Sequence, residues 1–346
     1  METLLEIQQD VRLAPFTTLK IGGNARLFIS AKTESDVTDA LQFARSNGLD
    51  VFILGGGSNL LISDNGFDGL VIHLGITGII LNKDTDGTDL VTAAAGEDWD
   101  RFVSYCVDRN LAGIECLSGI PGLVGGTPVQ NVGAYGQEVA ETIVAVRCLD
   151  RNSGKIATLT NAECGFSYRT SIFNSTHRER FIVLSVAFGL HKDGEPKLAY
   201  KDLIEYFVDR RPNLHEVREA VLKIRRSKSM VIDAHDPNSR SAGSFFKNPI
   251  VGRDKLDQLI GAFGGVPYFE FGDNFKIPAA WLIENAGFHK GYVLGDAGIS
   301  MNHSLALINR DRATAGGIIK LKERIQQEVE RKFEIELDPE PVFVGF

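Results

Sequence analysis

The chain has 346 residues, of which 43% are hydrophobic and 24% charged. This composition is typical of a globular protein, and the length is enough for two or three domains. The formal charge of −8 at pH 7 argues against general binding of nucleic acid or acidic membranes, so an anionic ligand needs a locally basic pocket. Residues 1–10 lack a basic start and a long apolar run, and we therefore expect a cytoplasmic protein without a secretion signal or membrane span.

The first part of the chain is predicted to be a small α/β unit. Thr33–Ala44 places apolar residues on one helical face, after a Thr33-x-x-Asp36 start that can satisfy free N–H groups. A short strand at Val51–Leu54 leads into a glycine-rich turn, and Leu70–Leu74 has the pattern of a second buried strand.

The second part mixes helices and strands without regular alternation, which favours an α+β arrangement over a doubly wound sheet. A second glycine-rich turn lies in this part, at Ser118–Gly126. A polar stretch at 233–241 follows the last helix and has the composition of a linker or mobile loop. The predicted elements are a helix at Trp99–Arg109, strands at Ile143–Leu149, Lys155–Leu159 and Phe181–Leu190, and a helix at His215–Arg226.

The third part is predicted to contain three helices. Pro278 stands where a first helical turn tolerates proline, and Gly287 where a helix commonly ends. The last helix has apolar residues at helical spacing, which is ordinary core patterning. The three helices are Asp254–Phe263, Pro278–Ala286 and Asp311–Phe333.

The two glycine-rich turns are the strongest functional signal. Residues without Cβ let several N–H groups turn toward one anion, so such turns can hold a phosphate. Neither turn has the spacing of a dinucleotide-binding G-x-G-x-x-G motif or the Gly-Lys-Ser/Thr of a P-loop. We therefore predict a bound dinucleotide on a fold other than the Rossmann fold. The alternative for any single glycine pair is a tight turn without a ligand.

The cysteines and histidines do not suggest a metal centre. Cys106, Cys116, Cys148 and Cys164 are scattered without metal-ligand spacing, and we expect reduced thiols in the core. The seven histidines contain no close ligand pair, so no metal is predicted.

Eight motifs occur in order along nearly the whole chain, and together they resemble the UDP-N-acetylenolpyruvoylglucosamine reductase family, in its subclass with a tyrosine loop. Any one of them alone would be weak. They are Thr18–Ala25, Leu54–Leu61, Gly119–Gly126, Asn131–Gly136, Tyr168-Arg169, Gly243–Pro249, Pro278–Asn285 and the segment from Leu337 to Val342.

The resemblance implies an α+β fold with an FAD-binding region of the vanillyl-alcohol-oxidase type. This region consists of two subdomains, 1–76 and 77–226, and the tail 340–346 is expected to join the first. A substrate-binding α+β domain is expected at 227–339. The contacts to FAD carry over to Gly55, Gly56, Gly57, Ser58, Asn59, Ser118, Gly119, Ile120, Gly122, Gly125 and Gly126.

The resemblance also implies a reaction, the NADPH-dependent reduction of UDP-N-acetylglucosamine enolpyruvate to UDP-N-acetylmuramate through bound FAD. The role is peptidoglycan precursor synthesis in the cytoplasm, and we expect a monomer. This reduction needs a hydride at the terminal carbon of the double bond and a proton at the carbon beside the carboxylate. Between these events the charge resembles an enolate and has to be offset by cations or hydrogen-bond donors.

By resemblance, Ser244 is the proton donor, Arg169 is the cation near the intermediate, and Glu340 is the third catalytic residue. Lys228 could stabilise the alkoxide left on Ser244. Without the resemblance, Ser244 would be a turn residue, Arg169 part of a surface salt bridge, and Glu340 part of a solvated terminal segment.

The expected substrate contacts are Tyr168, Tyr200, Lys228, Asn248 and Asn285. Tyr200 matches the tyrosine loop that closes over substrate, although a tyrosine at a helix entry is more often simple packing. Lys228 and Asn248 are expected at the diphosphate. Asn285 stands where some members of the family carry glutamine.

Two other functions remain open from the sequence. An oxidase of the same flavin fold would act on a sugar, a lactone or a hydroxy acid, and would need no acid for an enolate. A noncatalytic nucleotide-sensing module would keep the glycine turns and lose the acid site. Because Arg169, Ser244 and Glu340 are all present, the reductase is favoured.

Overall fold

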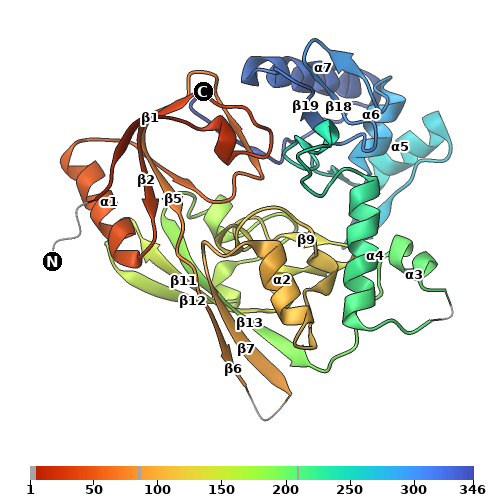
Figure 1. Ribbon diagram of the computed structural model, residues 1–346. Coiled ribbons are helices and arrows are strands. Elements are labelled where there is room, and N and C mark those ends of the chain that lie inside the picture. Colours follow the sequence, from red (N-terminus) through yellow and green to blue (C-terminus); the bar gives the residue numbers. More distant parts are fainter. Residues whose placement is uncertain (1–4, 84–86, 209) are drawn as a thin grey trace. The chain divides into compact units, whose positions relative to one another are not determined.

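The computed structural model describes residues 5–83, 87–208 and 210–346 (Figure 1). Within these ranges the chain forms two compact units. Unit 1 comprises the described residues of 1–11, 25–56 and 68–226, and unit 2 comprises 12–24, 57–67 and 227–346. The division into parts 1–76, 77–226 and 227–339 stays a prediction.

A four-stranded sheet lies in the N-terminal part of unit 1. Its strand order is β1 (Gln8–Arg12), β2 (Asn24–Ala31), β5 (Phe67–Leu74), β3 (Val51–Leu54), and β3 is parallel to β5. Helix α1 (Glu34–Ser46) begins with the predicted capping box, in which Thr33 and Asp36 bond to each other's backbone N–H groups. Its apolar face shares one core with β5.

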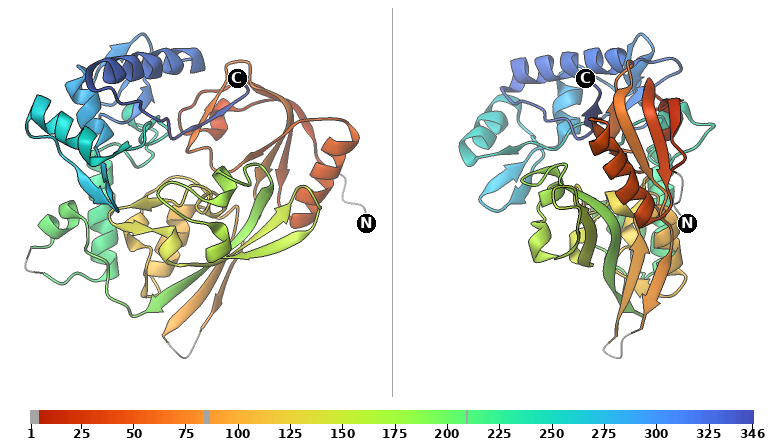
Figure 2. Two further views of the ribbon diagram at one scale, coloured as in Figure 1. Left: turned by 180° about the vertical axis from the view of Figure 1, so that it is seen from behind. Right: turned by 90° about the vertical axis from the view of Figure 1, so that its left-hand side faces the viewer.

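A larger antiparallel sheet forms the rest of the unit 1 scaffold. The long strand β13 pairs with β11 on one side and β7 on the other, as Figures 1 and 2 show. Strands β6 and β7 were not predicted, and the all-antiparallel pairing agrees with the α+β prediction. The strand order is β12 (Ile156–Thr160), β11 (Ile143–Asp150), β13 (Phe181–Lys192), β7 (Thr88–Ala94), β6 (Ile79–Asn82), and β8 (Leu111–Ala112) also pairs with β13.

Three helices and a short hairpin complete unit 1. The rings of Trp99 and Phe102 on α2 contact Phe188 on β13 at centroid distances of 5.9 and 5.1 Å, and so join helix and sheet. The elements are α2 (Trp99–Val107), α3 (Lys201–Tyr206), α4 (Leu214–Ser227), and a hairpin of β9 (Gly133–Ala134) and β10 (Gln137–Glu138).

Unit 2 contains three helices and three small sheets. The sheets are β14 (Ile250–Val251) with β16 (Asn274–Lys276) and β15 (Phe269–Phe271), β17 (Val293–Leu294) with β18 (Ala297–Ile299) and β19 (Leu307–Asn309), and β4 (Leu60–Ile62) parallel to β20 (Val342–Val344). The helices are α5 (Arg253–Phe263), α6 (Ala279–Asn285) and α7 (Ala315–Phe333).

The start of α7 differs from the prediction. The helix begins at Ala315 and not at Asp311, because Thr314 caps it by accepting a hydrogen bond from the Gly317 N–H. The carboxylate of Asp64 accepts from the N–H groups of Ala315 and Gly316 at 2.8 and 3.0 Å. These two side chains accept hydrogen bonds from the N–H groups of the first turn of α7. Because Asp64 is far from α7 in the sequence, its capping role could not be predicted.

The polar stretch at 233–241 is also more ordered than a linker. It contains a 3₁₀ turn at Pro237–Ser239, and the Ser239 hydroxyl donates to the carbonyls of Asp233 and Asp236. Further 3₁₀ turns lie at Ala14–Phe16, Glu115–Leu117, Val124–Gly126, Val139–Glu141, Ala162–Cys164 and Ile172–Asn174. Among the described helices, none has the length and apolar character needed to cross a membrane.

Candidate active site

Gly56, in the first glycine-rich turn, meets the second turn inside unit 1. A Cβ on Gly56 would lie 2.6 Å from the Cα and 2.9 Å from the C of Gly122, which is closer than a Cβ atom normally approaches another atom. Only glycine at position 56 therefore allows this backbone contact. In the same turn Gly57 has φ +62°, in the left-handed region that glycine favours.

The first turn presents backbone N–H groups that bond to no other part of the described chain. Among the residues that the structure describes, none accepts a hydrogen bond from the N–H groups of Gly56, Gly57 or Ser58. The carbonyl of Gly57 accepts from Thr18 N at 3.1 Å, which fixes the turn at its C-terminal side. Consecutive N–H groups in such a turn can bind a phosphate.

The second turn is held by the residues around the start of α2. Gly119 N donates to Asp100 Oδ1 at 2.6 Å, and Gly125 N donates to the Ala95 carbonyl at 2.9 Å. Gly126 N donates to the Leu123 carbonyl at 3.0 Å. In the described part of the chain, the N–H groups of Ile120 and Gly122 have no such acceptor. The turn is therefore fixed through three glycines and presents other N–H groups.

Asp100 links this turn to α4. Its carboxylate accepts two hydrogen bonds from the guanidinium of Arg218, at 2.6 and 2.9 Å. Partial burial raises the pKa of Asp100, but the bonds from Arg218 and from Gly119 outweigh it and hold that pKa below its usual range. Asp100 thus stays an acceptor for Gly119 at neutral pH. The sequence analysis did not single out either charged residue.

Arg169 is held in unit 1 in a strained conformation. Its φ is 54°, in the left-handed region that non-glycine residues avoid. Its Nη2 donates to the Gly133 carbonyl at 2.8 Å, and its own carbonyl accepts from Asn174 at 3.0 Å. The ring of Tyr168 lies 5.5 Å from its Cζ. Buried Asn131 bonds the same loop at the carbonyl of Ser167. These bonds fix the direction of the guanidinium.

Tyr200 lies just before α3, and its ring meets Tyr135 edge-on at 5.3 Å. Tyr200 is 40% exposed, so its ring can move without opening a core. Tyr135 is hydrogen-bonded to Arg225 on α4. Burial lowers the pKa of Arg225, although Tyr135 and Asp100 each act to raise it. The sequence motif at 131–136 contains Tyr135, but the pattern alone did not give it a role.

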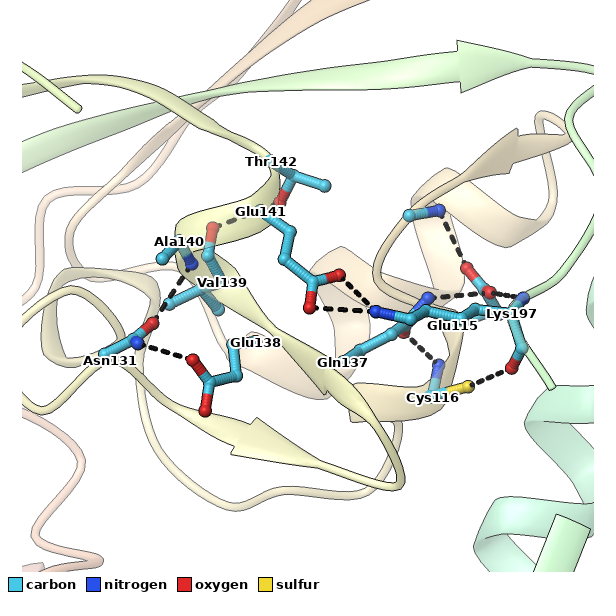
Figure 3. A network of polar contacts seen from close by, with 11 residues as sticks. Glu115, Cys116, Asn131, Gln137, Glu138, Val139, Ala140, Glu141, Thr142 and Lys197 are labelled. Atoms are coloured by element: carbon cyan, nitrogen blue, oxygen red, sulfur yellow. Dashed lines mark hydrogen bonds and ion pairs between the residues drawn. The ribbon is translucent and has the colours of Figure 1, made fainter. Parts of the chain in front are cut away.

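A buried polar network supports this region of unit 1, and Figure 3 shows Glu115 in its right-hand part, beside Gln137, Cys116 and Lys197. Glu115 is 0% exposed, and its Oε1 accepts from Gln137 Nε2 at 2.8 Å and from Lys197 N at 2.9 Å. Its Oε2 accepts from Gly113 N at 2.8 Å. One side chain therefore ties the residues before the second glycine turn to β10 and to the segment that leads to Tyr200.

Replacing Glu115 by Gln is expected to lower the free energy of unfolding by about 2 kcal/mol, because an amide NH₂ would then face an N–H donor in a buried site. Urea unfolding measures the change. The matched control is Glu141→Gln, since Glu141 binds the same residue, Lys197, but at a partly exposed site where an ion pair contributes little. Equal losses in both variants would contradict the role given to the network.

The acid candidate and Glu340 are brought together in unit 2 by backbone pairing. Glu340 N donates to the Phe245 carbonyl at 2.9 Å, and Lys247 N donates to the Asp338 carbonyl at 2.9 Å. An antiparallel bridge joins Phe246 and Pro339 between them. The segment of Ser244 thus runs alongside the segment of Glu340, although the two are far apart in sequence. Arg169 belongs to unit 1.

The remaining predicted substrate residues also lie in unit 2. Asn248 Oδ1 accepts from Ala279 N at 2.9 Å, and so caps α6. Asn285 is the exposed last residue of α6, and its Nδ2 donates to the Trp281 carbonyl at 2.9 Å. Lys228 is half-buried just after α4. The side-chain amides of Asn248 and Asn285 are therefore both fixed by hydrogen bonds to the backbone of α6.

Ser244 has one side-chain partner that the sequence analysis missed. Its Oγ lies 3.2 Å from the Nε2 of His303, in the loop between β18 and β19. The search for histidines considered only metal-ligand spacing, and His303 has none. Only the fold brings it to the serine.

The cysteines lie in the core, as predicted. All four are buried and free. Burial raises the pKa of Cys148 to about 11 and that of Cys164 to about 12, and it raises the pKa of Cys106 and Cys116 as well. They are thiols at neutral pH and poor nucleophiles. Within the described ranges, no group of three His, Cys, Asp or Glu residues could hold a metal ion.

Comparison with known proteins gives two family matches and close relatives. The FAD binding domain family matches residues 25–160, and the C-terminal domain of UDP-N-acetylenolpyruvoylglucosamine reductase matches residues 236–344. Reductases of that name from Thermobifida fusca and Nocardia farcinica are 43% and 44% identical, over 97% and 98% of this chain and 98% and 90% of theirs. The crystal structure of the Thermus caldophilus reductase superimposes with a TM-score of 0.67 at 25% identity, covering 98% of both chains.

Proposed function

The chain belongs to the family of UDP-N-acetylenolpyruvoylglucosamine reductases, and we propose that it reduces UDP-N-acetylglucosamine enolpyruvate to UDP-N-acetylmuramate with NADPH. The observation that carries this proposal is the backbone pairing of the Ser244 segment with the Glu340 segment. It sets a hydroxyl beside a carboxylate-bearing segment, as a reaction that ends in proton transfer to carbon needs. An oxidase of the same fold needs no such acid.

The family membership confirms two predictions: an FAD-dependent oxidoreductase of this reductase family, and an α+β FAD-binding fold. We propose that the enzyme acts in peptidoglycan precursor synthesis. The glycine turns fit the cofactor, because the backbone at Gly56 approaches that of Gly122 so closely that position 56 has no room for a side chain. We propose that the N–H groups of Gly56, Ile120 and Gly122, which all lie in unit 1, bind its pyrophosphate. The other residues of the two turns remain proposed FAD contacts. Bound FAD supplies the hydride for the double bond.

The residues of the chain have to position the substrate, polarise its double bond and protonate one of its carbons. We propose that Ser244 Oγ gives its proton to the carbon beside the carboxylate. The guanidinium of Arg169, already directed by its bond to Gly133, would offset the enolate-like charge. Glu340 would hydrogen-bond the reacting group, since its backbone is fixed to Phe245.

Five side chains are proposed to contact the substrate. Asn248 uses its Oδ1 on α6, so we propose that its Nδ2 donates to the diphosphate, together with the ammonium of Lys228. Tyr200 is proposed to close over the sugar nucleotide, which its exposure and its edge contact with Tyr135 allow. Tyr168 and Asn285 remain proposed substrate contacts.

One experiment tests the function. The purified holoenzyme is reduced with NADPH without oxygen, UDP-N-acetylglucosamine enolpyruvate is added, and the absorbance of the flavin is followed. Rapid return of the oxidised spectrum, with UDP-N-acetylmuramate as the product, is the expected result. A spectrum that stays reduced until oxygen enters would favour an oxidase, and a protein that binds nucleotide without any reduction would favour a sensing module.

We also propose that the protein acts in the cytoplasm as a monomer. The location is supported by the family's role and by the described helices, among which none could cross a membrane. Light scattering at micromolar concentration tests the monomer directly.

A further inference from the structure

His303 and Ser244 are held together by their backbones. Phe245 N donates to the Leu305 carbonyl at 2.8 Å, so the residue after Ser244 is bonded to the loop that carries His303. Within that loop Ala306 N donates to the His303 carbonyl at 3.1 Å. The distance of 3.2 Å between Ser244 Oγ and His303 Nε2 is therefore set by two fixed segments and not by flexible side chains on a surface.

The loop is anchored on its other side as well. Asn302 Nδ2 donates to the Oγ of buried Ser229 at 2.8 Å, and Met301 N donates to Asn238 Oδ1 at 2.9 Å. Both His303 and Ser244 are half-buried, so water only partly competes for their hydrogen bond. A loop fixed at three points holds the imidazole in one place.

The direction of this hydrogen bond decides what Ser244 can do. A hydroxyl has one proton and two acceptor lone pairs. If Ser244 donated to His303, its proton would point away from the substrate. For Ser244 to act as an acid, its oxygen has to accept from His303, which then carries its proton on Nε2.

We propose that His303 is a positioning residue for Ser244: its Nε2–H donates to Ser244 Oγ, directs the hydroxyl proton to the substrate, and stabilises the oxygen after that proton leaves. This inference rests on the proposed function of Ser244. It gives Ser244 a hydrogen-bond donor, His303, in addition to Lys228, which the sequence analysis expected to stabilise the alkoxide.

In the proposed step a proton passes from Ser244 Oγ to a carbon of the substrate. The O–H bond of Ser244 breaks, and a C–H bond forms at the carbon beside the substrate carboxylate. The electron pair of the broken bond stays on Oγ, which becomes an alkoxide and accepts the Nε2–H of His303. Water returns a proton to Oγ when the product leaves. A donor aimed at the atom that gains charge stabilises it far more than it stabilises the neutral hydroxyl.

The test compares His303→Leu with His303→Gln in the holoenzyme, with exposed His289→Gln as the matched control. The rate of flavin reoxidation by UDP-N-acetylglucosamine enolpyruvate is measured after reduction with NADPH. The Leu variant is expected to lose about tenfold in this step, and the Gln variant to retain most of the rate, because its amide places a donor near the Nε2 position. Reduction by NADPH and the Kd of the substrate should stay as in the wild type.

A double-mutant cycle separates this role from a merely structural one. In a Ser244→Ala background, His303→Leu should cost nothing further, since the atom it acts on is gone. A loss of tenfold in both backgrounds, or a Leu variant as fast as wild type, would overturn the proposal. If the Leu variant does not fold, His303→Gln alone tests the proposal. A loss in the rate of flavin reoxidation as large as in Ser244→Ala would contradict it, because the amide of Gln should replace the Nε2–H donor. Failure of the wild type to react would instead reject the proposed function.

Discussion

Replacing Ser244 by Ala is expected to leave reduction by NADPH unchanged and to slow the transfer to UDP-N-acetylglucosamine enolpyruvate by about 10³-fold, the usual contribution of a general acid. The hydroxyl lies in the segment fixed to Glu340, and its removal takes away the proton without filling or emptying the core. Stopped-flow absorbance of the flavin, with each half-reaction measured alone, distinguishes the two steps.

The control is Ser35→Ala, an exposed serine on α1 in unit 1, which should change neither half-reaction. Flavin content and thermal unfolding of both variants should match the wild type. If both half-reactions slowed equally in Ser244→Ala, the residue would be acting on cofactor binding or on folding, and the proton would have to come from another group.

Local signals in the sequence predicted the helices other than α3, and the strands β3, β5, β11, β12 and β13, but missed β2 and β7. The start of α1 was read from Thr33 and Asp36, which form the capping box in the structure, because a cap depends only on neighbouring residues. The start of α7 was missed because one of its caps, Asp64, is supplied from a distant segment. Short strands such as β6 carry too few residues for a periodic pattern.

The residues of the functional site were likewise predictable only where a local motif contains them. Motifs in sequence led to the glycine turns and to Ser244, whereas His303 and Glu115 have no motif of their own. Their roles depend on which atoms the fold brings to within hydrogen-bond distance: Ser244 Oγ for His303, and three N–H donors for Glu115. Such contacts join distant segments, so a pattern of neighbouring residues does not reveal them.

Replacing Gly56 by Ala is expected to weaken FAD binding by about 100-fold. The new Cβ would lie 2.6 Å from Gly122 Cα and 2.9 Å from Gly122 C, which are backbone atoms that cannot turn aside. The two glycine turns would have to separate, and overpacking of this kind costs about 1–3 kcal/mol. Because the N–H groups proposed to bind the pyrophosphate lie in these turns, separating the turns would move those groups out of place and weaken FAD binding. Titration of the apoprotein with FAD, followed by flavin fluorescence, measures it.

A glycine outside the two turns provides the matched control. A Cβ on Gly261, inside α5, would meet nothing within 4 Å, and its φ is not in the left-handed region, so Gly261→Ala adds the same methyl group without the clash. Gly261→Ala should therefore bind FAD as tightly as the wild type, and should unfold at a similar or slightly higher temperature, since alanine restricts the unfolded chain. Equal loss of FAD binding in the two variants would contradict a role for the close approach of the two backbones. A loss only at Gly56 would establish that the contact with Gly122 shapes the cofactor site.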